Sequence, residues 1–165
     1  KIGLINSGFV NTNLQFINGE LDIGSPRAIP IIQKIKESIS SDQIVIFDAP
    51  PGNSCPVIET ISGSDFCILV TEPTAFGLWD VRIAVKVVRE LNIPFGIIIN
   101  RTGISDQEQF LDDFCKEENI PILMKIPFEK KIAEDYSRGI PLVNSPVWKE
   151  KFLHLFNSCK ELVNQ

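Results

Sequence analysis

The stretch IVIFDAPPGNSCP, residues 44–56, decides the fold of this chain. Residues 44–47 are apolar and mostly β-branched, which is typical of a strand that is covered on both faces in a parallel sheet. Asp48 follows directly, so we expect it at the carboxyl end of that strand. In open α/β sheets, ligands bind at this edge.

A sharp turn and a helix start are predicted after the aspartate. Two prolines and Gly52 cannot continue a strand or a helix. Asn53 or Ser54 can cap a helix that begins near Cys55. A carboxylate beside such a turn can hold a magnesium ion through its water shell, and backbone N–H groups there can face a phosphate. The alternative is that Asp48 merely caps a turn.

The length, composition and net charge are those of a globular chain. It has 165 residues, of which 44% are hydrophobic and 22% charged, and its net charge is −5. This charge argues against general binding to nucleic acid or to anionic lipid. No apolar run is long enough to span a bilayer, and no signal peptide is recognised, so we expect a cytoplasmic protein without a membrane partner.

The cysteines form no metal or redox motif. They are widely spaced, and a zinc site within the chain is not expected because His154 is the single histidine. Scattered single cysteines fit a reducing cytoplasm. The four are Cys55, Cys67, Cys115 and Cys159.

Strand and helix patterns alternate along the rest of the chain. This alternation predicts an α/β fold with a doubly wound, mainly parallel sheet. We expect one domain over 1–165, with a β segment at 1–24 and an α/β core at 25–165. The expected strands are 44–47, 66–70, 95–99 and 120–124, and the expected helices are 26–39, 55–61, 80–91, 105–116, 129–138 and 146–163. The loops at the carboxyl ends of the strands should cluster on one edge.

Two catalytic patterns are rejected. Residues 19–24 have the glycine spacing of a phosphate loop, but Ser25 and Pro26 stand where that motif requires Lys and then Ser or Thr. An α/β-hydrolase would need a nucleophile elbow around Ser54 and a histidine partner. The closing glycine of the elbow is missing, and His154 is expected in the last helix.

Several loops, in this order, resemble the MinD/ParA type of P-loop ATPase, whose relatives include the nitrogenase iron protein and the iron–sulfur cluster carrier ATPases. The resemblance is strongest to the MinD-superfamily ATPase that carries an inserted ferredoxin domain. It covers nearly the whole chain. The segments that carry it are FINGELDIG (16–24), DAPPGNSCP (48–56), VTEPTAFGLWD (70–80), IINR (98–101) and IPF (126–128).

The resemblance implies roles for the loop after residues 44–47. Asp48 is similar to the acidic residue that positions magnesium and water in the family. Pro50, Pro51 and Gly52 are similar to the switch that senses the γ-phosphate of ATP.

The resemblance also implies a base-binding site. Asn100 is similar to the asparagine that hydrogen-bonds the adenine edge, with Arg101 beside it, and Pro127 and Phe128 are similar to the loop that lines the base. An Asn amide offers a donor and an acceptor, and an apolar loop can pack on the face of a base. The alternative is that Asn100 is a plain helix cap or turn residue.

In such folds, the loop that carries Thr71, Glu72, Thr74 and the nearby Asp80 lies near the partner subunit or the inserted domain. Glu72 could equally be a solvated loop carboxylate. Trp79 could be a surface aromatic at an interface or a core residue.

One departure from the family is large. The phosphate loop with its signature lysine and the clustered cysteines of the ferredoxin insert are absent from the 165 residues. In the family both precede the segments that match here. The chain is therefore expected to be the C-terminal part of a larger ATPase, to lack hydrolytic activity alone, and to leave an exposed sheet edge at its N-terminal side.

For the intact protein, the resemblance implies binding of ATP and Mg²⁺, a homodimer, and a redox or metallocofactor partner. It places 4Fe–4S clusters only in the missing insert. The alternative function is a non-catalytic scaffold or dimerisation module that keeps a nucleotide-binding shape.

Overall fold

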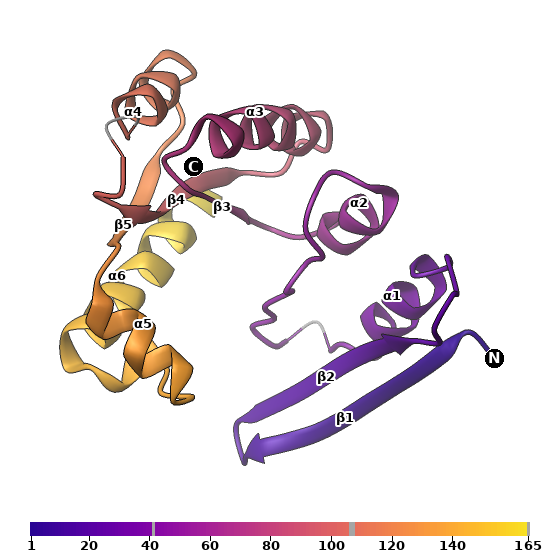
Figure 1. Cartoon of the computed structure of the whole chain (residues 1–165). Helices are drawn as coiled ribbons and strands as arrows, with labels where there is room; N and C mark the ends of the chain where they lie inside the picture. Colours follow the sequence, from indigo (N-terminus) through magenta and orange to yellow (C-terminus); the bar gives the residue numbers. More distant parts are fainter. Residues whose placement is uncertain (41, 106–107, 165) are drawn as a thin grey trace. The chain divides into compact units, whose positions relative to one another are not determined.

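The computed structural model describes residues 1–40, 42–105 and 108–164 (Figure 1). The chain forms two compact units, Lys1–Ser62 and Gly63–Gln165. The expectation of one domain over 1–165 stays a prediction. No helix of the described ranges is long and apolar enough to cross a bilayer.

The first unit contains the β segment predicted for residues 1–24, and this segment is a hairpin. Strands β1 (Gly3–Asn11) and β2 (Leu14–Leu21) pair antiparallel. Helix α1 (Ile29–Lys36) packs on the hairpin, where any side chain at Gly19 would overlap Ile31. Gly19 and Gly24 therefore have structural roles, since Gly24 forms the turn after β2 with φ 82°. Helix α2 (Cys55–Ile61) follows, as predicted.

Two predictions for this unit need correction. Residues 44–47 form no strand, because no segment of the described ranges pairs with them. Ile44 and Ile46 are consequently 75% and 89% exposed. The first helix begins at Ile29 and not at Pro26, with Pro30 in its first turn, where a missing N–H costs no hydrogen bond.

The second unit contains a parallel sheet with strand order β3-β4-β5. Its strands are β3 (Cys67–Thr71), β4 (Phe95–Thr102) and β5 (Ile122–Pro127). This confirms the α/β fold class and the parallel pairing, with three strands in the sheet where four were expected.

Helices flank this sheet on both faces, with α3 and α4 on one side and α6 on the other (Figure 1). Ile97 and Ile99 of β4 are fully buried and pack with side chains of α3 and α4, whereas Ile98 points to the opposite face. The helices are α3 (Ala75–Glu90), α4 (Glu108–Glu117), α5 (Lys130–Ser137) and α6 (Pro146–Val163), and a 3₁₀ turn spans Leu142–Asn144.

Helix α3 begins five residues before the predicted Asp80. Its start is fixed by Thr74, whose hydroxyl accepts the backbone N–H of Gly77 at 3.0 Å. Helix α4 begins at Glu108, while the predicted start at Ser105 precedes Asp106 and Gln107, which lie outside the described residues.

Strand β3 forms one edge of the sheet. It pairs with β4 on one side, and no strand of the described ranges pairs with its other side. Ile68 and Val70 of this strand are 41% and 63% exposed. The apolar run at 66–70, which was predicted as a strand of the sheet, is thus covered on one face and paired on one side.

Candidate functional site

The carboxyl ends of β3, β4 and β5 meet at one edge of the sheet because the strands are parallel. We call this the carboxyl edge, formed by residues 71–74, 100–105 and 127–128. Most of the residues predicted for the base-binding and partner loops lie there. The edge belongs entirely to the second unit.

The segment after β3 is held closely against the start of α3. The buried Thr71 hydroxyl donates to the carbonyl of Gly77 at 2.9 Å. A side chain at Gly77 would overlap the carbonyl oxygen of Glu72. The hydroxyls of Thr71 and Thr74 therefore stabilise the loop. Glu72 is the residue of this predicted partner loop whose side-chain carboxylate remains partly exposed.

Asn100 and Arg101 lie near the end of β4, where the register with β5 is irregular. Arg101 has the left-handed backbone conformation, with φ 56°. The side-chain oxygen of the half-buried Asn100 accepts the backbone N–H of Arg101 at 3.0 Å. This bond fixes which end of the carboxamide faces the backbone and leaves its NH₂ group without a hydrogen-bond partner among the described residues.

Three contacts connect the segments of the carboxyl edge. Arg101 Nη1 lies 3.3 Å from Glu72 Oε1, so Glu72 is more than a solvated carboxylate. The Ser105 hydroxyl donates to the carbonyl of Pro73 at 2.5 Å. The backbone N–H of Phe128 donates to the carbonyl of Thr102 at 2.9 Å. The three segments therefore form one connected structure before any ligand binds.

Apolar and aromatic side chains are available at this edge. Pro127 ends β5 and is half-buried, and the Phe128 ring is 58% exposed. Trp79 on α3 is 66% exposed, which excludes its alternative role as a core residue. Phe76 in the first turn of α3 was not among the predicted site residues and is 84% exposed. Asp80 is exposed and makes no hydrogen bond or ion pair with the described residues.

A charged cluster beside the edge was also missed. Lys125 on β5 donates to Glu108 at 2.9 Å and to Asp112 at 2.8 Å, and Glu108 also accepts the N–H of Gly103 at 3.3 Å. The hydrogen bond from Lys125 lowers the pKa of Glu108 below its ordinary value. Partial burial lowers the pKa of Lys125, but its two carboxylate partners outweigh this and leave it raised. The i,i+4 spacing of Glu108 and Asp112 was the sequence feature that could have indicated this cluster.

The predicted magnesium and switch loop lies in the first unit. Asp48 is exposed and makes no hydrogen bond or ion pair with the described residues, so it does not cap the turn. Gly52 has φ 92°, which confirms a turn that requires glycine. Pro51 before it is exposed, and Ser54 occupies the N-cap position of α2 without a side-chain capping bond.

Lys36 anchors the two sides of this loop. Its ammonium group donates to the carbonyls of Glu59 and Ser62 at 2.8 and 2.6 Å, at the end of α2. It also lies 5.5 Å from the centre of the Phe47 ring. The loop from Asp48 to Ser54 is therefore bounded by two segments that share one cation.

Metal binding by protein side chains alone finds no support in the described ranges, because they contain no group of three or more His, Cys, Asp or Glu residues with suitable spacing. All four cysteines are free. Burial raises the pKa of Cys115 to about 11, with Asp112 adding to the effect.

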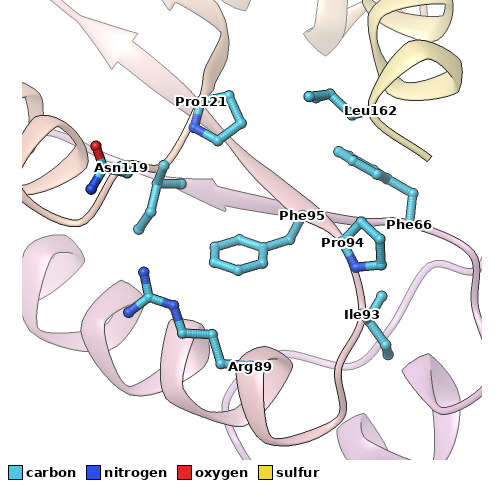
Figure 2. Close-up of a pocket in the computed structure, with 9 residues that line it drawn as sticks. Phe66, Arg89, Ile93, Pro94, Phe95, Asn119, Pro121 and Leu162 are labelled. Atoms are coloured by element: carbon cyan, nitrogen blue, oxygen red, sulfur yellow. The ribbon is translucent and has the colours of Figure 1, made fainter. Parts of the chain in front are cut away.

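Figure 2 shows a pocket of about 330 Å³ at the opposite, amino end of the sheet. Phe66, Phe95 and Pro121 line it at the starts of the three strands. Its Arg89 guanidinium is already paired with the Glu118 carboxylate at 2.6 Å. None of the predicted site residues lies in this pocket.

Sequence comparison finds longer relatives. An uncharacterized protein of Methanocaldococcus jannaschii is 32% identical over 154 residues, which are 92% of this chain and 51% of the relative. An uncharacterized ATP-binding protein of the same organism is 25% identical and matches 81% of this chain and 54% of its own length. The iron–sulfur cluster carrier protein of the same organism is 30% identical over 113 residues, which are 60% of this chain and 39% of the carrier. No family model matches.

The chain spans about half the length of the first two of these relatives. Comparison of structures agrees on the fold. The cell division ATPase MinD of Pyrococcus furiosus matches with a TM-score of 0.57 and 24% identity, over 70% of this chain and 50% of MinD. MinD of Aquifex aeolicus matches with a TM-score of 0.58 and 19% identity, over 83% of this chain and 59% of that MinD.

Proposed function

Because this chain is a relative of the MinD/ParA superfamily of P-loop ATPases, we propose that the carboxyl edge of its second unit binds the adenine base of ATP. The observation that carries this proposal is the oriented Asn100 carboxamide, which stands at the end of β4 with its NH₂ group free to face a ligand. A relative described as ATP-binding supports it.

The side chains of the edge fit a purine base. The NH₂ group of Asn100 can donate to a ring nitrogen, and the second lone pair of its oxygen can accept from the adenine amino group. The exposed Phe128 ring and Pro127 offer an apolar surface for the face of the base. In this proposal Asn100 binds the base, whereas its alternative role is that of a plain helix cap or turn residue.

For the first unit by itself, we propose a role of the Asp48 loop in binding magnesium and sensing phosphate. The exposed carboxylate of Asp48 fits a hydrated magnesium ion, since hard oxygen ligands suit that cation. Pro50, Pro51 and Gly52 would form the segment that responds to the γ-phosphate. ATP supplies the phosphoanhydride bond that is hydrolysed.

This chain alone would not hydrolyse ATP. Its 165 residues lack the phosphate-loop lysine, which supplies positive charge to the β- and γ-phosphates. We therefore assign hydrolysis to a longer protein in which additional residues complete the site. The relatives' greater length supports this proposal.

The iron–sulfur carrier relatives support coupling of ATP to a redox or metallocofactor partner protein. We extend this to a cytoplasmic homodimer that carries any 4Fe–4S clusters on residues outside these 165. The four free cysteines of the chain agree with a reducing compartment.

A second candidate is a non-catalytic scaffold or dimerisation module of nucleotide-binding fold. The apolar side chains exposed on α3 and β3 favour it, chiefly Phe76, Trp79 and Val70. The two candidates differ in whether the full-length protein turns over ATP.

The test is ATP hydrolysis by the full-length protein and its Asp48→Asn variant. We expect hydrolysis by the wild type, and its loss in the variant with unchanged thermal unfolding. Asp65→Asn, which alters another exposed carboxylate, is the matched control and should retain activity. Wild-type turnover in Asp48→Asn would refute the role of Asp48, and ATP binding without turnover by the wild type would favour the scaffold.

A further inference from the structure

Arg101 has an unusual backbone conformation for its residue type. Three non-glycine residues of the described ranges have positive φ: Asn92 at 54°, Asn119 at 54° and Arg101 at 56°. Asparagine is enriched in this conformation, and both asparagines follow the ends of helices, where it is common. Arginine gains no such local benefit. An uncommon backbone conformation at this edge motivates a functional hypothesis for Arg101.

The Arg101 side chain connects two segments of the carboxyl edge. Its guanidinium lies 3.3 Å from the Glu72 carboxylate in the loop that leads into α3. That loop is itself rigid, because Thr71 and Thr74 bond to Gly77 on either side of it. Glu72 is therefore a fixed point that can hold the arginine turn in place.

The backbone of Arg101 in turn orients Asn100. The Arg101 N–H donates to the Asn100 side-chain oxygen at 3.0 Å. This bond sets which end of the amide faces outward, and the two ends have opposite hydrogen-bonding character. Adenine offers an amino donor where guanine offers a carbonyl acceptor. An amide held in one orientation can distinguish them, whereas one that rotates freely can serve both.

We propose that the Glu72–Arg101 ion pair positions the Asn100 carboxamide and thereby sets the preference for adenine over guanine nucleotides. The proposal rests on the proposed function of the carboxyl edge. Glu72 and Arg101 are positioning residues, since they act on the base through Asn100. Both side chains are about half-exposed, at 40% and 54%, so the effect is modest, roughly two- to fivefold.

The experiment measures equilibrium affinities of the full-length protein for ATP and for GTP. Glu72→Gln and Arg101→Gln should each lower the ATP-over-GTP affinity ratio about two- to fivefold. The double variant should lower it no further, because either change alone breaks the pair. Arg101→Lys, which keeps the positive charge, should retain most of the ratio.

The matched control is Glu118→Gln. It breaks the Arg89–Glu118 ion pair at the amino end of the sheet, whose side chains are similarly exposed at 45% and 40%. It should leave the ATP-over-GTP ratio unchanged even if it lowers thermal stability. An equal change of the ratio in Glu118→Gln would show a general effect of stability and would contradict positioning by Glu72.

The outcomes separate this inference from the proposed function. A wild type that binds ATP and GTP equally, or an unchanged ratio in Glu72→Gln and Arg101→Gln, overturns the positioning role and leaves nucleotide binding intact. Additive effects in the double variant overturn the pairing. A full-length protein that binds neither nucleotide overturns both proposals.

Discussion

Residues 44–47 of the first unit and 97–99 of the second are similar apolar runs with opposite environments. In the first run, Ile44 and Ile46 are 75% and 89% exposed, while Ile97 and Ile99 in the second are fully buried. Both runs have the composition of a buried strand. Only the second has a strand on each side, since β4 lies between β3 and β5.

Whether an apolar run becomes a strand is therefore decided by the strands available to pair with it. The two regions with proposed roles, one in each unit, differ in the same way. The base-binding edge lies on a packed core with three connecting contacts. The Asp48 loop relies on Lys36 and two short helices. We expect the carboxyl edge to be preorganised and the Asp48 loop to be the less stable of these two regions.

The largest expected effect compares the two runs directly. Ile97→Ala should destabilise the protein by about 2–5 kcal/mol because it leaves a cavity in a fully buried site. Ile46→Ala, the matched change at an 89% exposed site, should change stability by less than about 0.5 kcal/mol. Chemical denaturation of each variant measures both. A cost for Ile46→Ala as large as that for Ile97→Ala would show that residues 44–47 are buried in solution.

The next effect tests how closely the β3 loop is packed. Gly77→Ala should cost about 1–3 kcal/mol, since the new methyl group would overlap the carbonyl oxygen of Glu72. Gly8→Ala in β1 is the control, because its new side chain would meet no atom within 4 Å. Thermal unfolding compares them. If Gly77→Ala unfolds at the wild-type temperature, the carboxyl edge is less rigid than we infer.

An effect of similar size, but confined to local opening, is expected in the first unit. Lys36→Met removes the cation that bonds the end of α2, which should cost about 1–3 kcal/mol in local opening. Lys34→Met removes only an exposed pair with Glu37 and should have little effect. Hydrogen exchange of the α2 amides measures this opening. Equal protection in both variants would show that Lys36 does not anchor the Asp48 loop.

The smallest effect is a pH dependence of the second unit. The pKa of Glu108 is lowered from its ordinary 4.5 by Lys125, so this pair stabilises the fold above that pH and the stabilisation is lost as pH falls below it. Lys125→Met should reduce the acid sensitivity of unfolding slightly. The control Lys130→Met removes a more exposed pair with Glu134. An identical pH profile for wild type and Lys125→Met would exclude this contribution.

Much of the second unit could be predicted from sequence because local and tertiary signals agree there. The apolar runs around Ile68, Ile97 and Leu123 all lie in or at strands of one parallel sheet. Helix α6 ends at the predicted residue, with Leu155 buried on its inner face. The start of α3 was predicted wrongly because its N-cap, Thr74, precedes a segment in which apolar residues show no clear helical spacing.

The first unit and the site were less predictable for physical reasons. No local pattern states whether a strand-like run has a partner, so residues 44–47 were assigned wrongly. The turn at Gly52 was recognisable because its chemistry is local. The contacts of Glu72 with Arg101 and of Lys125 with Glu108 join distant segments, and their geometry depends on the folded sheet. The roles of Asp48 and Asn100 in nucleotide binding remain predictions.

The most direct test of the base-binding edge is the affinity of the full-length protein for ATP and GTP, with and without Asn100→Ala. We predict that the wild type prefers ATP and that Asn100→Ala lowers this preference by about tenfold, because the variant loses the oriented amide. Asn157→Ala, an exposed residue of α6, should match the wild type. An unchanged preference in Asn100→Ala would show that the base is held elsewhere and would contradict the proposed site.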